Sequence, residues 1–108
     1  MRFNFEECLE KTITIEGMIS SIPWQHIIGV FEDYPYSEYF DLENNEQIVI
    51  YSRTRILKRN TKVKLTGKII KLTGKSKRPG SNQVYFEYQM MVDNWHYVYE
   101  DVQLHENE

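Results

Sequence analysis

The residues of this chain best suited to chemistry are its cations, because they gather in one stretch. Eleven of the 13 Lys and Arg residues lie between Arg53 and Arg78, and this stretch contains no Asp or Glu. The chain as a whole has a formal net charge of −3, and the preceding stretch 12–52 carries acidic residues but no Lys or Arg. A segregated cationic surface attracts phosphate groups. The charge pattern therefore predicts a protein with one phosphate-attracting side.

Residues used for catalysis and metal binding are present, but their spacing does not fit either role. The three histidines (His26, His96 and His105) have no spacing that would place two of them on one metal ion, and Cys8 is the only cysteine. The sequence TGKSKRPG contains a Gly-Lys pair but lacks the preceding glycine and the strand-to-helix context of a P-loop. We therefore expect no enzymatic activity, no metal site and no cofactor.

Length and composition indicate the class of protein. A chain of 108 residues is long enough for one domain with a real core and too short for two. Its apolar runs are too short to span a membrane, and its N-terminus lacks the apolar core of a signal peptide. A single cysteine allows no internal disulfide, which fits a reducing compartment. We expect a cytoplasmic protein with no membrane partner.

Most of the chain has the alternating pattern of β-strands. The pattern places Ile13, Ile15 and Ile19 on one face of the first strand, and Gly17 in its middle, where a bulge or bend is expected. Asn44-Asn45 suits a tight turn between the second and third strands. Gly67 repeats the central glycine in the fourth strand. The five predicted strands span residues 12–21, 39–42, 47–51, 62–72 and 84–92.

Little helix is expected. Asn4 and Glu7 form a capping box that predicts a short helix ending near Lys11. The segment between Tyr51 and Lys62 has room for a turn or two at most. The sequence thus divides into an N-terminal extension or short helix (1–11), one β domain (12–95) and a C-terminal tail (96–108).

This order of strands resembles the OB-fold. The residues that carry the resemblance are IEGMISSI, EYFDLENNEQIVIYS, KVKLTGKIIKL and VYFEYQMMVDNW. The arrangement is similar to that of OB domains in replication protein A and in tRNA-anticodon-binding modules, except that the helix between the third and fourth strands is short or missing. The resemblance implies an all-β, five-stranded Greek-key barrel, in which the central glycines let strongly curved strands serve both halves.

The resemblance also implies a binding surface for single-stranded DNA or RNA across the second and third strands. Bases would stack on aromatic rings while Lys and Arg neutralise the phosphates. The first loop, Pro23–Ser37, would contribute aromatic rings, and the loop Gly74–Asn82 would contribute cations. The residues expected at the site are Trp24, Tyr36, Tyr39, Tyr51, Lys75, Lys77 and Arg78.

Other interpretations remain open for the same residues. Lys62, Lys64 and Lys68 follow strand alternation and suit a solvated face that pairs with Glu16 and Glu87. Trp24 could plug the barrel mouth, or line a small-ligand site there together with Trp95. Acidic residues beside the second and third strands would repel nucleic acid. They also suit the main alternative, a protein-interaction module that docks a partner or a second copy of itself.

Overall fold

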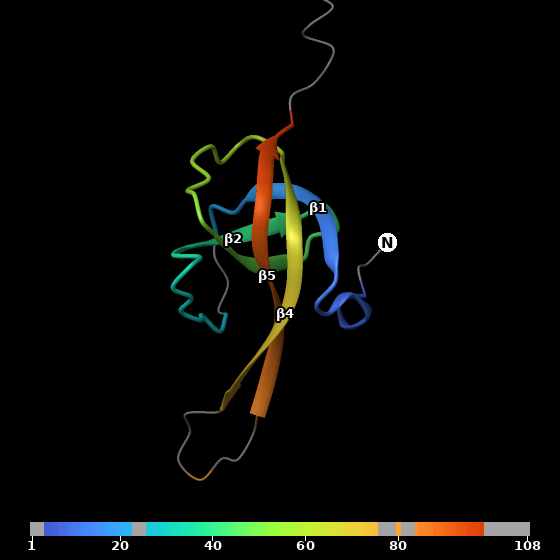
Figure 1. Cartoon of the computed structure of the whole chain (residues 1–108), viewed down its shortest axis with the longest axis vertical. Coiled ribbons are helices and arrows are strands. Elements are labelled where there is room, and N and C mark those ends of the chain that lie inside the picture. The colour runs from blue at the N-terminus through green and yellow to red at the C-terminus, as the bar shows by residue number, and fades with distance from the viewer. Residues whose placement is uncertain (1–3, 23–25, 76–79, 81–83, 99–108) are drawn as a thin grey trace, which may run out of the picture.

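The protein is an all-β molecule with one five-stranded sheet that closes into a ring (Figure 1). The computed structural model describes residues 4–22, 26–75, 80 and 84–98, with only the backbone of Lys75. The strands are paired in the order β1-β2-β3-β5-β4, and β4 pairs in turn with β1. The elements are the 3₁₀ helix η1 (Phe5–Cys8), β1 (Thr12–Ile19), β2 (Tyr36–Leu42), β3 (Gln47–Ser52), β4 (Val63–Lys75) and β5 (Val84–Tyr97).

The five predicted strands are present, but their ends differ from the prediction. β4 runs three residues beyond Leu72, and β5 runs five residues beyond Val92 and so passes the predicted domain end at residue 95. These two strands pair with each other along their whole length, and this pairing overrides the loss of alternation near the end of β4. The predicted strands 12–21 and 39–42 instead become Thr12–Ile19 and Tyr36–Leu42.

The predicted helices shrink or disappear. Asn4 caps the N-terminus of η1 as expected, with its side-chain oxygen accepting from the Glu7 N–H at 3.4 Å, but the helix ends at Cys8 rather than at Lys11. The connection from Arg53 to Lys62 contains bends and no helix. Within the described residues, no helix is long and apolar enough to cross a membrane.

Two glycines let neighbouring strands approach each other closely. A Cβ atom on Gly17 would lie 2.1 Å from the carbonyl oxygen of Asp41 on β2, and one on Gly67 would lie 2.0 Å from that of Met91 on β5. The register of β4 against β5 shifts between Thr66 and Gly67, which is a β-bulge. The backbones therefore approach at distances that no other residue type allows.

The core lies inside the ring and contains two of the three isoleucines that alternation placed on one face of β1, while the third, Ile13, is only partly buried. Ile15, Ile19, Val63, Leu65 and Ile69 are all buried. β3 is exceptional because its residues are buried on both faces, and Val49 and Tyr51 are as inaccessible as the inward-facing Ile48 and Ile50. Something other than the ring must therefore cover the outer face of β3.

The ring closes through a short parallel pairing of β3 with β5, which we call the seam. It consists of three residue pairs, Ile50–Met90, Tyr51–Met91 and Ser52–Val92. In contrast, β4 and β5 continue together well past the rest of the ring (Figure 1). We call this projecting hairpin, Lys71–Lys75 with Val84–Tyr88, the arm.

Candidate nucleic-acid interface

The structure describes the side chains of three of the seven residues that the sequence grouped into one site, Tyr36 and Tyr39 on β2 and Tyr51 on β3. Tyr36 is 40% exposed, and the guanidinium of Arg55 lies 6.0 Å from its ring centre. Tyr39 is half-buried, with its ring 5.5 Å from the imidazole of His26. Trp24, Lys77, Arg78 and the side chain of Lys75 lie outside the described residues.

The prediction that Tyr51 belongs to an open stacking platform is wrong. Tyr51 is 1% exposed because the segment after His26 lies over the outer face of β3. The Phe31 ring packs edge-on against it at 4.7 Å, and the Gly29 N–H donates to its hydroxyl at 2.9 Å. The hydroxyl in turn donates to Gln89 Oε1 at 2.5 Å. Burial raises the pKa of Tyr51, and its ring has no face left for a base.

The residues from His26 to Phe31, which we call the covering segment, are anchored across the seam by His26. Its Nδ1 lies 2.8 Å from Glu87 Oε1 on β5, and its Nε2 lies 2.9 Å from Gln47 Oε1 on β3. The other oxygen of Glu87 accepts from the Ile27 N–H at 2.7 Å, while Gln89 Nε2 donates to the Ile27 carbonyl at 2.5 Å. The segment therefore bridges two strands that pair with each other only at the seam.

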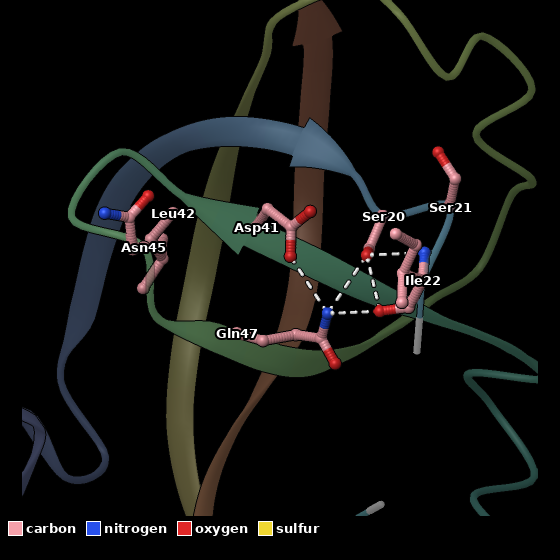
Figure 2. A pocket seen from close by; sticks show the side chains of 7 residues that line it. All are labelled: Ser20, Ser21, Ile22, Asp41, Leu42, Asn45 and Gln47. Atoms are coloured by element: carbon pink, nitrogen blue, oxygen red, sulfur yellow. Dashed lines mark hydrogen bonds between the residues drawn. The ribbon is translucent and has the colours of Figure 1, made fainter. Parts of the chain in front are cut away.

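The surroundings of Gln47 determine how its side-chain amide faces His26. Figure 2 shows the amide nitrogen of Gln47 directed at three acceptors, Asp41 Oδ1 at 2.9 Å, Ser20 Oγ at 3.0 Å and the Ile22 carbonyl at 3.1 Å. The amide oxygen must then face His26, so Nε2 has to donate. Nδ1 faces the carboxylate of Glu87 on the other side of the ring, so the imidazole is held between β3 and β5.

The hollow in Figure 2 serves this anchor. Its lining residues are Ser20, Ser21, Ile22, Asp41, Leu42, Asn45 and Gln47. Gln47 Nε2 donates to both Ser20 Oγ and Asp41 Oδ1 across it. The hollow thus positions Gln47, and through Gln47 it positions His26.

The first half of the cationic stretch forms ion pairs with the acidic half of the chain. Lys64 Nζ lies 3.3 Å from Glu16, as the strand pattern predicted, and Lys62 Nζ lies 2.8 Å from Glu43. Arg59 lies 3.8 Å from Glu38. The positive charges of these three side chains are therefore already balanced by carboxylates of the same chain. The prediction that Glu87 would pair with the strand lysines is wrong, because His26 and Ile27 hold its carboxylate.

A further pair of aromatic and cationic side chains lies where β5 passes the end of β3. The guanidinium of Arg53 sits 4.6 Å above the ring centre of Tyr34 and donates to its hydroxyl at 2.8 Å. That hydroxyl donates to Asp93 at 2.7 Å, and this hydrogen bond raises the pKa of Tyr34. Arg53 also lies 3.6 Å from Asp93, so a carboxylate accompanies this cation as well.

The arm carries a different arrangement, which we call the arm strip: Lys71, Phe86 and Tyr88. Lys71 Nζ lies 4.2 Å from the centre of the Phe86 ring and 5.9 Å from that of Tyr88. The two rings meet edge-on at 5.4 Å, and Phe86 is 51% exposed. An exposed aromatic ring beside an ammonium group is suited to stack a base while neutralising a phosphate.

The strip ends at η1. The hydroxyl of Tyr88 donates to the carboxylate of Glu6, and this hydrogen bond raises the pKa of Tyr88. Lys71 lies 4.0 Å from the same carboxylate, and the Phe5 ring lies 6.2 Å from the Tyr88 ring. Glu6 is thus the acidic group next to the strip.

Sequence reasoning missed the arm strip, because alternation placed Phe86 and Tyr88 on one face of the last strand without showing how far that face is covered. They do share a face with the buried Met90 and Val92. Because β4 and β5 project beyond the ring, however, the outer part of that face has no core to cover it. The length of the β4–β5 pairing was the missing information.

Within the described residues, no group of three or more His, Cys, Asp or Glu side chains could hold a metal ion. A scan against protein-family models finds no match for this chain, and searches of curated proteins and of solved structures find none either.

Proposed function

We propose that this chain is an OB-type barrel that binds single-stranded nucleic acid without catalysis, acts in the cytoplasm, and uses the arm as its main contact. The ring order β1-β2-β3-β5-β4 and the close crossings at Gly17 and Gly67 support a small barrel with strongly bent strands. The observation that carries the binding proposal is Lys71 over the exposed ring of Phe86.

The charges of the arm support this choice. From Arg53 to Phe86 the chain contains no acidic residue, and the first acid after the arm tip, Glu87, is bound to His26 and Ile27. Of the cations before the arm, four lie beside carboxylates: Arg53, Arg59, Lys62 and Lys64. On the arm, Lys71 lies 4.0 Å from the carboxylate of Glu6, and Lys75, Lys77 and Arg78 follow in the sequence. The arm thus concentrates positive charge beside aromatic rings, which suits a phosphate backbone with unpaired bases.

The covered face of β3 moves the proposed site away from Tyr51. Lys75, Lys77 and Arg78 remain in it as predictions from the sequence, and Lys71, Phe86 and Tyr88 join them. Tyr36 and Tyr39 are partly accessible and would extend a bound strand toward β2. Trp24 keeps its predicted role in stacking.

The test is a titration of the intact protein with labelled oligo(dT) and oligo(U) at several salt concentrations. Phe86→Ala should weaken binding by about 1–3 kcal/mol, the usual worth of one stacked base. Lys71→Ala should reduce the log–log salt slope by about 0.7, the value of one phosphate contact on a single strand. Lys64→Ala removes the same charge from a lysine paired with Glu16 and should change neither quantity much.

Absence of binding to any oligonucleotide at low salt would contradict the proposal. Equal effects of Lys64→Ala and Lys71→Ala would contradict the placement of the site on the arm.

A further inference from the structure

The arm leaves two strand edges without a backbone partner among the described residues. β1 pairs with β4 only as far as Lys68, and a single bridge from Leu9 follows at Ile69. β3 pairs with β5 only from Met90 onward. Beyond these points β4 and β5 pair only with each other. Unpaired strand edges are templates for adding another strand.

The two edges differ in their chemistry. The β4 edge carries Lys71 and Lys75, and lysines are a common protection against edge pairing. The β5 edge begins with three consecutive uncharged residues that are all large and exposed. Val84, Tyr85 and Phe86 are 58%, 46% and 51% accessible. The β5 edge is therefore the one suited to receive a strand.

We propose that the β5 edges of two copies of this chain pair with each other, antiparallel, about a two-fold axis at Phe86. This register sets Phe86 opposite Phe86 of the second copy, Val84 opposite Tyr88, and Tyr85 opposite Glu87. Each cross-strand pair is aromatic or apolar on at least one side, and none joins like charges. A two-fold pairing also uses the same edge twice and closes on itself.

Charge disfavours two alternative pairings of the arm. Two β4 edges centred on Thr73 would set Lys71 against Lys75 in both directions. A β5 pair centred on Glu87 would set two carboxylates opposite each other. Like charges placed directly opposite are destabilising. A β4 edge against a β5 edge would leave a free edge on each side and grow into an open chain of copies.

The pairing would join the two arm strips into one surface. In an antiparallel pair whose two-fold axis is perpendicular to the sheet, equivalent side chains lie on the same face. Phe86 and Tyr88 of both copies would then line one continuous face. The pairing itself needs no nucleic acid, so it stands independently of the proposed binding function.

Sedimentation of the intact protein without nucleic acid tests the pairing. The expected mass rises with concentration from that of one 13.0 kDa chain toward that of two. Tyr85→Glu places a carboxylate opposite Glu87 and should hold the protein at the lower mass. Tyr85→Lys loses the same ring but places an ammonium there, and it should still pair. A constant mass of 13.0 kDa at every concentration would overturn the inference.

Cysteine crosslinking tests the register. In a Cys8→Ser background, Phe86→Cys should form an intermolecular disulfide on mild oxidation, because opposite Cα atoms lie about 4.5–5.5 Å apart. Val84→Cys is the matched control, since it is equally exposed but lies four residues out of register with its own copy. At about 3.4 Å per residue its separation is roughly 14 Å, which no disulfide can span. Equal crosslinking of the two variants would overturn the register.

Discussion

His26 and Glu87 are 61 residues apart in the sequence and form the hydrogen bond that ties the β1–β2 connection to β5, with 2.8 Å between Nδ1 and Oε1. Gln47 fixes the other side of the same imidazole. His26 therefore connects β3 to β5, next to the Ile27 and Gly29 hydrogen bonds that hold the same segment over Tyr51.

Replacing His26 should destabilise the protein. His26→Ala removes one hydrogen-bond partner from the partly buried carboxylate of Glu87 and one from the side-chain oxygen of Gln47, and such losses cost about 1–3 kcal/mol each. We expect the free energy of unfolding in urea to fall by roughly 2–4 kcal/mol in total. His96→Ala, at an exposed position on β5, is the control and should change the free energy by less than about 0.5 kcal/mol. Equal losses in the two variants would show that His26 is not an anchor.

Tyr51 should make the protein lose stability at alkaline pH. Its pKa is raised above the ordinary value of 10.0 because burial disfavours the phenolate. The contribution of protonated Tyr51 to the free energy of unfolding is therefore complete below the pKa that this tyrosine has in the unfolded chain. It is lost as the pH rises through the higher pKa of the folded state. Unfolding free energies measured upward from about pH 9 should fall more steeply for the native protein than for Tyr51→Phe. The variant should also be less stable at neutral pH, because Gln89 loses its donor. Parallel pH curves would contradict this prediction.

Neither close-crossing glycine should tolerate alanine. Gly67→Ala forces a Cβ atom to within 2.0 Å of the Met91 carbonyl oxygen, so the backbones of β4 and β5 must separate. We expect a loss of about 3 kcal/mol or more, at the upper end of overpacking effects. Gly74→Ala, on the same strand, meets its nearest atom at 3.4 Å and should stay within about 1 kcal/mol of the native protein. The test is to compare the free energies of unfolding of the two variants by thermal or chemical denaturation, and equal losses would contradict the prediction.

Glu6 should limit the affinity of the arm for nucleic acid. Its carboxylate holds the Tyr88 hydroxyl and lies 4.0 Å from Lys71. Glu6→Gln removes a charge that repels phosphate, and at such distances in water one charge is worth about 1 kcal/mol. We expect oligonucleotide binding at low salt to strengthen by roughly two- to fivefold. Glu7→Gln changes the neighbouring exposed carboxylate and is the control. An equal gain in both variants would mean that only net charge matters.

Alternation and glycine placement made the strands and the core predictable. The inward positions of Ile15, Leu65 and Ile69 and the bends at Gly17 and Gly67 depend on local patterns that the sequence contains directly. The ion pair of Glu16 with Lys64 was predictable because the first and fourth strands of such a barrel lie next to each other. These features need only the period of a strand and the order of strands in the sheet.

The covering of Tyr51 and the exposure of Phe86 could not be predicted in the same way. Both depend on how far elements extend in space rather than on their period. Tyr51 is buried because a connection without regular structure folds back over β3, held by side-chain contacts between His26 and distant strands. Phe86 is exposed because β4 and β5 extend beyond the ring. The alternation of apolar and polar residues along a strand is the same whether or not a core covers that part of the strand.

The three-pair seam divides the molecule into unequal cooperative units. β4 and β5 share thirteen residue pairs, whereas β3 holds β5 through only Ile50, Tyr51 and Ser52. A fluctuation that parts β3 from β5 breaks few backbone bonds, while one that parts β4 from β5 breaks many. Amide hydrogen exchange should therefore be faster at the seam than along the middle of the β4–β5 pair. β1 and β2 also share only three residue pairs, so the ring has two short connections at which it would open, while β5 stays attached to its long partner β4.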